Sequence, residues 1–338
     1  MSGNDTILVW GAGAIGGTLG AYWARAGKDV ALVDNVAAHV EAINKTGLKI
    51  EGPVEEFTAK VPAFMPEQVT GIYRRVVLAV KAHHTEGAMR QLLPHLAPDG
   101  YVLSAQNGLN ELTIARIAGE KRTMGCFVNF GADYLEPGKL LFGGRAAVVV
   151  GELDGSTTPR VQEMFELLKV FEPNAVLTDN IWGYLWGKLG YGALLFATAL
   201  TNASIADALE APKYFGTYRR LAGEAMAVAA AKKVRPLGFN GYEPMAFMPG
   251  APEAATRASI AAMVKHNRGS AKSHSGIWRD LAVRKRKTEI DAQIAIISSI
   301  GREIGVKTPM VDRLVTLIHE IEDGKRPMDW SSLDALGA

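Results

Sequence analysis

The sequence predicts an α/β domain with a mostly parallel sheet, followed by an all-α domain. Three observations support this expectation. A short apolar run, a glycine turn, a helical segment and a second apolar run open the chain; similar apolar runs recur as far as residue 128; and beyond about residue 178 Ala-rich and Leu-rich helical segments replace them. We therefore expect one domain over residues 1–178 and a second over 179–338.

The bulk composition fits a globular chain without a strongly charged partner. Its 338 residues suffice for two domains of ordinary size, and a hydrophobic content of 48% can build a substantial core. Lysine and arginine number 37 against 35 acidic residues, a net charge of +2. No overall field of this size attracts nucleic acid or an anionic membrane, so we expect neither as a partner.

The apolar stretch "DNIWGYLWGKLGYGALLFATALTN" (179–202) raises the question of a membrane span. One lysine and four glycines interrupt it, which favours a buried helix instead. The N-terminus lacks the basic and apolar regions of a signal peptide, and we expect a cytoplasmic protein. Cys126 is the single cysteine, and His83 and His84 do not complete a ligand set with it, so we predict no metal site.

The first domain begins with a βαβ pattern. "TILVW" (Thr6–Trp10) and "DVALVD" (Asp29–Asp34) are predicted strands, and the helix between them should end near Gly27. Further strands are expected where apolar runs recur, at 76–80, 101–105 and 122–128. The segment "GKLLFGGRAAVVVGE" (138–152) is predicted to form an antiparallel pair around Gly143–Gly144.

The second domain contains helical patterns separated by loops. The predicted helices cover 181–210, 216–233, 253–265, 275–304 and 309–323. The stretch between 235 and 254 is rich in proline and glycine and is predicted to be a loop. Its aromatic and methionine side chains allow two interpretations, a cover over a pocket or a plain surface excursion.

The glycine turn "GAGAIG" fits the pattern G-x-G-x-x-G of dinucleotide-binding Rossmann domains. It follows a predicted strand and opens a helix, which is the context that the pattern requires. Gly11 would permit the tight turn, Gly13 the approach of the pyrophosphate, and Gly16 close packing of helix and strand. Amides at the start of the helix, including Ala14 and Ile15, would then face the phosphates.

Asp34 ends the second strand, 18 residues beyond Gly16, where a carboxylate holds the adenosine ribose hydroxyls. The predicted cofactor is NAD(H) or NADP(H). A carboxylate at this position repels a 2′-phosphate, and no arginine follows in "VDNVAAH", so NAD(H) is favoured.

Four further motifs occur in order along the chain: "LAVKAHHT" with Lys81, "SAQNGLNE" with Asn107, "IWGYLWGKL" with Lys188 and "RKRKTEID" with Glu289. Together they resemble the ketopantoate reductase (2-dehydropantoate 2-reductase) family. The resemblance runs nearly end to end. It implies a Rossmann-type N-terminal domain, a C-terminal domain like that of 6-phosphogluconate dehydrogenase, and a place in pantothenate biosynthesis.

The resemblance also implies a role for each of these residues. Lys81 would lie beside the nicotinamide ribose, and Asn107 would contact cofactor and substrate. Lys188 would be the general acid, and Glu289 would bind the substrate and help to set the lysine. This role suits a lysine on an apolar helix face, because burial should lower its pKa toward neutrality.

Purely structural roles for these residues also remain open. Lys188 could lay its methylene stem along apolar surface with its ammonium in water. Glu289 is expected on a helix, in one stripe with Gln293, Ile296 and Ile300, where it could equally be a solvated surface residue. The basic run 284–287 is expected on the wet side of that helix.

The chain departs from the family at three substrate-binding positions. One and two turns beyond Lys188, where the best-known members have asparagines, it has Gly192 and Phe196. Losing two polar groups should weaken binding of a hydroxyl-rich substrate. The family serine upstream of T-E-I-D is matched with shifted spacing, and we favour Ser275 over Ser273.

The expected function is NAD(P)H-dependent reduction of a 2-oxo acid, ketopantoate or a relative, to the D-2-hydroxy acid. One alternative is a family dehydrogenase for a more apolar 2-hydroxy acid, mandelate-like or branched-chain. Another is a non-catalytic NAD(H)-sensing Rossmann protein. The expected partners are a small 2-oxo acid and a second copy of the chain in a homodimer.

Overall fold

A computed structural model describes residues 5–269 and 273–338, and the chain divides into two compact units. The first unit comprises residues Met1–Ile181 and the second Trp182–Ala338. The division falls close to the expected boundary between residues 178 and 179. Each unit is described by itself below.

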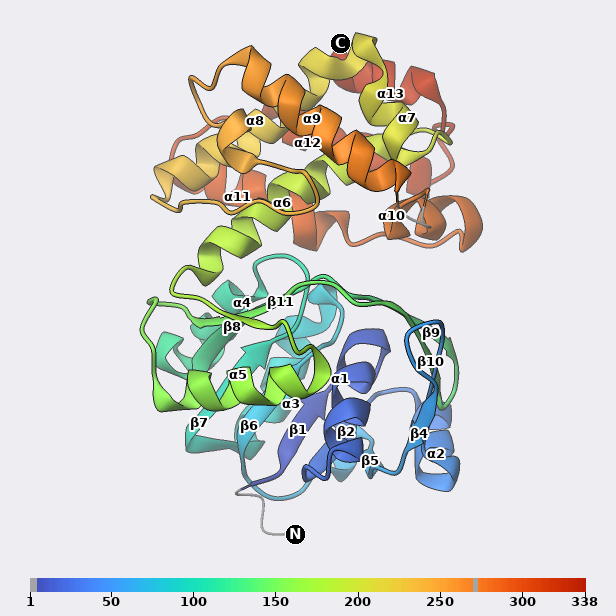
Figure 1. Cartoon of the computed structure of the whole chain (residues 1–338), viewed down its shortest axis with the longest axis vertical. Coiled ribbons are helices and arrows are strands. Elements are labelled where there is room, and N and C mark those ends of the chain that lie inside the picture. Colours follow the sequence, from blue (N-terminus) through green and yellow to red (C-terminus); the bar gives the residue numbers. More distant parts are fainter. Residues whose placement is uncertain (1–4, 270–272) are drawn as a thin grey trace. The chain divides into compact units, whose positions relative to one another are not determined.

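The first unit is built on an eight-stranded sheet in the order β12-β11-β8-β7-β6-β1-β2-β5 (Figure 1). The pairings from β5 through β2, β1, β6 and β7 to β8 are all parallel, and β11 is antiparallel to β8. The predicted parallel sheet is therefore confirmed. The strands are β1 (Ile7–Trp10), β2 (Val30–Val33), β5 (Ala63–Phe64), β6 (Tyr73–Leu78), β7 (Leu96–Ser104), β8 (Thr123–Val128), β11 (Val148–Glu152) and β12 (Val176–Leu177).

Helices cover both faces of this sheet, because its central strands are apolar on both sides. In β1, Ile7 and Val9 face the cluster beneath α1 (Ala14–Arg25) and α5 (Pro159–Phe171). Leu8 and Trp10 face the opposite cluster, which includes residues of α3 (Thr85–Leu92) and α4 (Asn110–Ala118). This is the doubly wound arrangement of a Rossmann domain.

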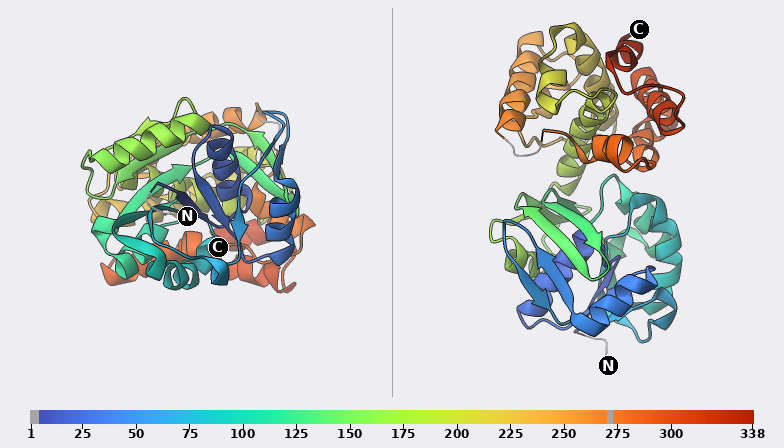
Figure 2. Two further views of the ribbon diagram at one scale, coloured as in Figure 1. Left: turned by 90° about the horizontal axis from the view of Figure 1, so that it is seen from below. Right: turned by 90° about the vertical axis from the view of Figure 1, so that its right-hand side faces the viewer.

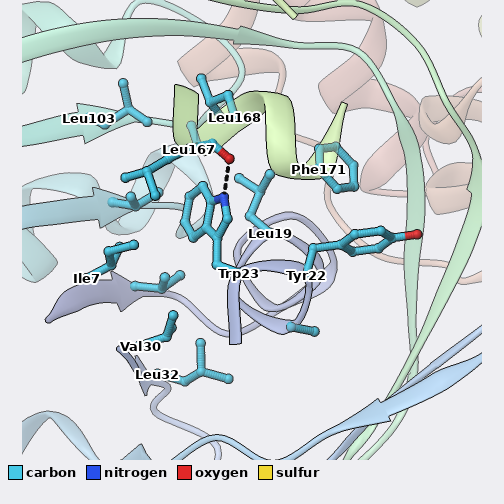
Figure 3. Close-up of a cluster of buried hydrophobic side chains, with 14 of the residues drawn as sticks. Ile7, Leu19, Tyr22, Trp23, Val30, Leu32, Leu103, Leu167, Leu168 and Phe171 are labelled. Carbon is cyan, nitrogen blue, oxygen red and sulfur yellow. Dashed lines mark hydrogen bonds between the residues drawn. The ribbon is translucent and has the colours of Figure 1, made fainter. Parts of the chain in front are cut away.

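The indole of Trp23 lies at the centre of the first cluster (Figure 3). Its Nε1 donates a hydrogen bond of 2.6 Å to the carbonyl of Leu167 in α5. Beside it, the rings of Tyr22 and Phe171 meet edge to face, with centroids 5.0 Å apart. A buried indole nitrogen needs such an acceptor, so this bond fixes α5 against α1 as well as satisfying the donor.

The expected antiparallel pair over 138–152 is wrong. Its two halves, β10 (Lys139–Gly144) and β11, belong to different sheets, and β10 joins a four-stranded sheet in the order β4-β3-β10-β9. The burial pattern shows why: β10 alternates between buried and partly exposed residues, whereas β11 is buried throughout. The other strands of the second sheet are β3 (Leu48–Glu51), β4 (Phe57–Ala59) and β9 (Gly131–Glu136).

The second unit is helical, and Figure 2 shows it from two further sides. Within its described residues, 182–269 and 273–338, the β pairing is limited to a bridge between Phe239 and Tyr242. No helix in the described part of the chain is long and apolar enough to cross a membrane. The helices are α6 (Ile181–Thr198), α7 (Ile205–Glu210), α8 (Phe215–Ala231), α9 (Glu253–Arg268), α10 (Gly276–Trp278), α11 (Ile296–Glu303), α12 (Pro309–Glu322) and α13 (Trp330–Gly337).

Two helices that the sequence predicts as continuous are broken. The segment 181–210 stops after Thr198 and restarts at α7, where the Ser204 hydroxyl caps the new helix by accepting a bond from Asp207 N. The segment 275–304 opens into a loop at 284–289, with Lys285 at a φ of 49°. The basic run 284–287 thus lies in this loop, and its expected place on a helix is wrong.

The loop between α8 and α9 packs directly on α6. Leu237 N donates to the carbonyl of Gly183 at 2.9 Å. A Cβ on Gly187 would lie 2.0 Å from Leu237 O, and a Cβ on Gly190 would lie 2.2 Å from the Tyr242 hydroxyl. The glycines of α6 therefore make room for this loop, whose Tyr242 is 1% exposed. Tyr242 and Phe247 of this loop are thus buried in the unit, whereas Glu243 and Met245 are exposed.

Candidate active site

The three glycines of the turn after β1 differ in what surrounds them. Gly11 has a φ of +103°, and a Cβ there would lie 2.7 Å from Val80 N. A Cβ on Gly16 would lie 2.1 Å from Gly11 O, so helix and turn pack without room for a side chain. At Gly13 no atom of the described chain lies within 4 Å of that position. Gly11 thus makes the tight turn, Gly16 lets the helix pack closely on the turn, and Gly13 leaves space for a ligand to approach.

The N-terminus of α1 is open to an anion. Gly13 is its N-cap, and no described side chain caps it. The first turn carries no acidic residue, and Gly13, Ala14 and Ile15 are partly exposed. The free amides and the helix dipole at this end suit a pyrophosphate. The residues present therefore fit a dinucleotide cofactor.

Asp34 directly follows β2 and is partly exposed. Its Oδ1 accepts a bond of 3.0 Å from Val36 N, which fixes the side chain and leaves the second oxygen for another donor. Arg25, the nearby cation on α1, donates to Glu55 at 2.6 Å and lies 3.9 Å over the ring of Phe57. The guanidinium of Arg25 is therefore paired with Glu55 in this structure.

A buried histidine ties the glycine turn to the β9–β10 hairpin. Gly138 N donates to His39 Nδ1 at 2.9 Å, so the proton is on Nε2, which donates to the carbonyl of Ala12 at 2.9 Å. The ring of Tyr134 in β9 lies 5.0 Å from that of His39. Burial and the negative charge of Asp34 raise the pKa of Tyr134, which places its hydroxyl in the field of that carboxylate.

Lys81 and Asn107 follow the carboxyl ends of the neighbouring parallel strands β6 and β7, and both are exposed. β6 also pairs with β1, so these loops and the glycine turn share one edge of the sheet. Between β1 and β6 the strand order reverses direction along the chain. Such a switch point is where doubly wound folds bind their ligands.

A buried polar network, which the sequence analysis missed, holds both loops. Gln106 is 5% exposed, and its Nε2 donates to Val80 O and to Thr85 Oγ1 at 2.8 Å each. Thr85 in turn donates to Asn110 Oδ1 at 2.9 Å, and Asn110 Nδ2 donates to Asn107 O at 2.6 Å. The signal was present, because these three residues stand inside the motifs that contain Lys81 and Asn107.

Lys188 lies near the start of α6 and is partly exposed, whereas Trp186 and Leu189 beside it are buried. One turn further on, a Cβ on Gly192 would lie 3.8 Å from Ile294 Cδ1. The face of α6 that carries Lys188 and Gly192 therefore looks toward the helical segment that follows Glu289. This contact brings the two residues onto adjoining elements of one unit.

Glu289 does not lie within a helix, which corrects the expected stripe with Ile296 and Ile300. It precedes the helical segment that begins at Ile290, whose first part, Asp291–Ala295, is a π-helical turn. Gln293 donates twice to Glu289, from its backbone N to the carbonyl at 2.9 Å and from Nε2 to the carboxylate at 3.3 Å. Glu289 is partly exposed at this helix start, a place where π-turns recur in functional sites.

Phe196 and Ser275 have structural roles in this state of the unit. Phe196 is 1% exposed, so its ring belongs to the core. The Ser275 hydroxyl caps α10 by accepting a bond of 3.1 Å from Trp278 N, and the residue is 7% exposed. Their contacts with substrate stay predictions, and for Phe196 the ring would have to turn outward first.

Comparisons with known proteins identify relatives of the whole chain. The family model described as "Ketopantoate reductase PanE/ApbA" matches residues 7–155, and "Ketopantoate reductase PanE/ApbA C terminal" matches 180–322. A 2-dehydropantoate 2-reductase of Mesorhizobium japonicum is 28% identical, over 93% of this chain and 97% of its own length. A solved ketopantoate reductase from Ralstonia eutropha is 26% identical with a TM-score of 0.78, over 95% of this chain and 99% of its own. D-mandelate dehydrogenase, solved with NADH and anilino(oxo)acetate, is 23% identical with a TM-score of 0.81 over the same shares.

Proposed function

The chain belongs to the ketopantoate reductase family, whose members are NAD(P)-dependent oxidoreductases, and we propose that it reduces a 2-oxo acid to the D-2-hydroxy acid with Lys188 as general acid. The observation that carries the proposal is the proximity of Gly192 to Ile294, since a Cβ on Gly192 would lie 3.8 Å from Ile294 Cδ1. It brings the helix of Lys188 close to the helical segment that follows Glu289, and both of these residues are partly exposed.

Each residue has a defined task in the proposed reaction. The turn at Gly11, Gly13 and Gly16 binds the cofactor phosphates, and the bound nicotinamide supplies a hydride to the carbonyl carbon. Lys188 donates its proton to the carbonyl oxygen and stabilises the alkoxide that develops there. Glu289 orients the substrate and the lysine. Lys81 contributes to the nicotinamide end and Asn107 to the substrate carboxylate, both from the edge of the sheet.

The test is the initial rate of NADH and NADPH oxidation with ketopantoate as the sole acceptor. Rapid turnover would identify ketopantoate as a substrate. No turnover with any 2-oxo acid, in a sample that binds NADH, would contradict the proposed reaction. Single-turnover hydride transfer then separates the enzyme from a protein that only senses NAD(H), because a sensor would leave bound NADH unoxidised.

We propose that Asp34 makes NADH the preferred cofactor. Asp34→Asn should lower the ratio of kcat/KM for NADH to that for NADPH at least about tenfold, because the amide no longer repels a 2′-phosphate. Glu41→Gln, an exposed carboxylate on α2 (Ala37–Thr46), is the matched control and should leave the ratio unchanged. Equal ratios in both variants would show that the preference is set elsewhere.

A second candidate substrate, a bulkier and more apolar 2-oxo acid, is favoured by Gly192. Position 192 carries no side chain, and a Cβ there would lie 3.8 Å from Ile294 Cδ1, an ordinary apolar contact one turn beyond Lys188. Gly192→Asn should raise kcat/KM for ketopantoate relative to phenylglyoxylate about tenfold, since a hydrogen-bonding group is added and room is lost. Gly216→Asn, on an exposed glycine of α8, controls for the loss of a helical glycine. An unchanged ratio would remove Gly192 from the substrate site.

We also propose that the protein forms a homodimer, an expectation from the helical pattern of the second domain in the sequence. Sedimentation equilibrium of the purified chain would test it, with a single monomeric species as the contradicting result.

A further inference from the structure

The residues on either side of Glu289 are anchored to the body of the helical unit. Thr288 donates from both its backbone N and its hydroxyl to Glu322 Oε1, each at 2.7 Å. Ile290 is fully buried, and its backbone N donates to Thr288 Oγ1 at 3.3 Å. Glu289 is thus held between two fixed neighbours, and the direction of its side chain depends on both.

Glu322 is itself held by a second set of bonds. It ends α12, and its side chain is 1% exposed. Its Oε2 accepts from His319 Nδ1 at 2.9 Å, and His319 Nε2 donates to Asp291 Oδ1, also at 2.9 Å. Both ring nitrogens face carboxylates, an arrangement that favours the protonated imidazole. Asp291 belongs to the π-helical turn that follows Glu289, so the chain is gripped on both sides of that residue.

We propose that Glu322, oriented by His319, is a positioning residue that fixes the direction of the Glu289 carboxylate. This inference rests on the proposed function, in which Glu289 orients the substrate. Glu322 does not itself touch the reacting atoms. It acts by holding Thr288 in place at the end of the loop 284–288, which joins two π-helical turns. Nearer the start of this loop, Arg284 and Arg286 bind Asp280, so Glu322 holds the end of the loop that leads into Glu289.

The chemistry of position 322 requires a carboxylate. Three donors converge on it, two from Thr288 and one from the imidazolium of His319. A carboxylate only accepts, so it satisfies all three. A glutamine would turn its NH₂ group toward one set of donors and leave a buried polar group unpaired. Glu322→Gln therefore disrupts this set of hydrogen bonds with almost no change in side-chain volume.

The network also has a pH dependence of known sign. Burial lowers the pKa of His319, but hydrogen bonds to Glu322 and Asp291 outweigh it and raise the pKa above its usual value. The charged groups that face the ring are these two carboxylates and Asp323. Since the folded pKa is raised, the stabilisation is complete below the unfolded value and is lost as pH rises through the folded pKa. The hydrogen bonds that hold Thr288 should therefore weaken as the pH rises above the folded pKa of His319.

The first test compares Glu322→Gln with Asp312→Asn, which removes an exposed carboxylate from the same helix. Glu322→Gln should lower kcat/KM for the 2-oxo acid between about tenfold and a hundredfold, the scale expected when a reacting group is misplaced by about 1 Å. The NADH dissociation constant should match that of the control. An unchanged kcat/KM, or a loss explained by the unfolded fraction alone, would overturn the proposal.

His319→Gln supplies a second readout that a purely structural role would not move. The alkaline limb of the pH profile of kcat/KM that arises from this histidine should disappear, while the activity near neutrality falls less than in Glu322→Gln. A profile identical to that of the unmodified protein would contradict the role of His319. This variant keeps the bonds between Thr288 and Glu322, so it remains informative where Glu322→Gln does not fold.

A third variant separates failure of this inference from failure of the proposed function. Glu289→Gln should impair turnover of the 2-oxo acid at least as strongly as Glu322→Gln. Normal rates in Glu289→Gln would refute the proposed role of Glu289, and with it the inference. Impaired Glu289→Gln beside unaffected Glu322→Gln would refute the positioning role alone.

Discussion

Lys188→Ala should lower kcat at least about a hundredfold with any 2-oxo acid that the protein reduces, the scale of a lost general acid. The NADH dissociation constant should stay within about twofold, because the lysine belongs to the helical unit and the glycine turn to the α/β unit. Initial rates at saturating acceptor and a fluorescence titration with NADH measure the two quantities. Lys265→Ala, which removes an exposed lysine of α9, controls for the loss of a positive charge.

The large fall in kcat is expected because of the position of Lys188. Its neighbours along α6 are buried, and the residue is partly exposed on the face that looks toward Ile294. Removing the side chain takes away the ammonium group that would protonate the developing alkoxide. A variant that lost NADH affinity but kept its turnover number would overturn the assignment and favour a role in cofactor binding.

Gly16→Ala and Gly13→Ala should fail in different ways, although they lie three residues apart in the same turn. The Cβ of Gly16→Ala would lie 2.1 Å from Gly11 O and 2.8 Å from Ala79 Cβ. Backbone cannot move aside as a flexible side chain can, so this variant should lose about 1–3 kcal/mol of unfolding free energy. Denaturant unfolding measures that loss.

Gly13→Ala should fold with unchanged stability, because its methyl meets no atom of the described chain within 4 Å. The methyl would occupy the space that a pyrophosphate needs, so NADH affinity should fall about tenfold or more. Each variant serves as the control for the other. If Gly13→Ala bound NADH normally, the phosphates would not pass over this glycine. If Gly16→Ala were as stable as the unmodified chain, the helix would not pack as tightly as described.

Much of the α/β unit could be predicted because buried parallel strands produce a simple pattern in the sequence, a run of apolar residues. β1 and β2 are continuous apolar runs, β8 is buried throughout, and β6 and β7 each contain an apolar run, at 76–78 and 101–103. β9 could not be found in this way, since much of it is partly or fully exposed and its pairing with β10 is a long-range choice. Because β9 is not recognisable in the sequence, the apolar run of β11, which follows β10, suggested the wrong partner for β10.

In the candidate site, too, local features could be predicted from the sequence and long-range contacts could not. Motifs located Lys81, Asn107, Lys188 and Glu289, because the types and order of these residues are local properties of the chain. Their supports are not local: Glu322 contacts Thr288 across 34 positions, and Gly138 contacts His39 across 99. The break of the helix at 284–289 was also hidden, because apolar spacing of helical type continues on both sides of it.

The unequal crowding along α6 defines where the substrate range of this protein can be altered in the laboratory. Side chains added at Gly187 or Gly190 would collide at once with Leu237 O or the Tyr242 hydroxyl. A Cβ at Gly192 would have Ile294 Cδ1 at 3.8 Å as its one neighbour within 4 Å in the described chain, which is an ordinary contact. A library for directed evolution should therefore vary Gly192 together with Ile294 and leave the other two glycines untouched. Small residues at position 192 should be accommodated, and selection would then act on the choice of acceptor.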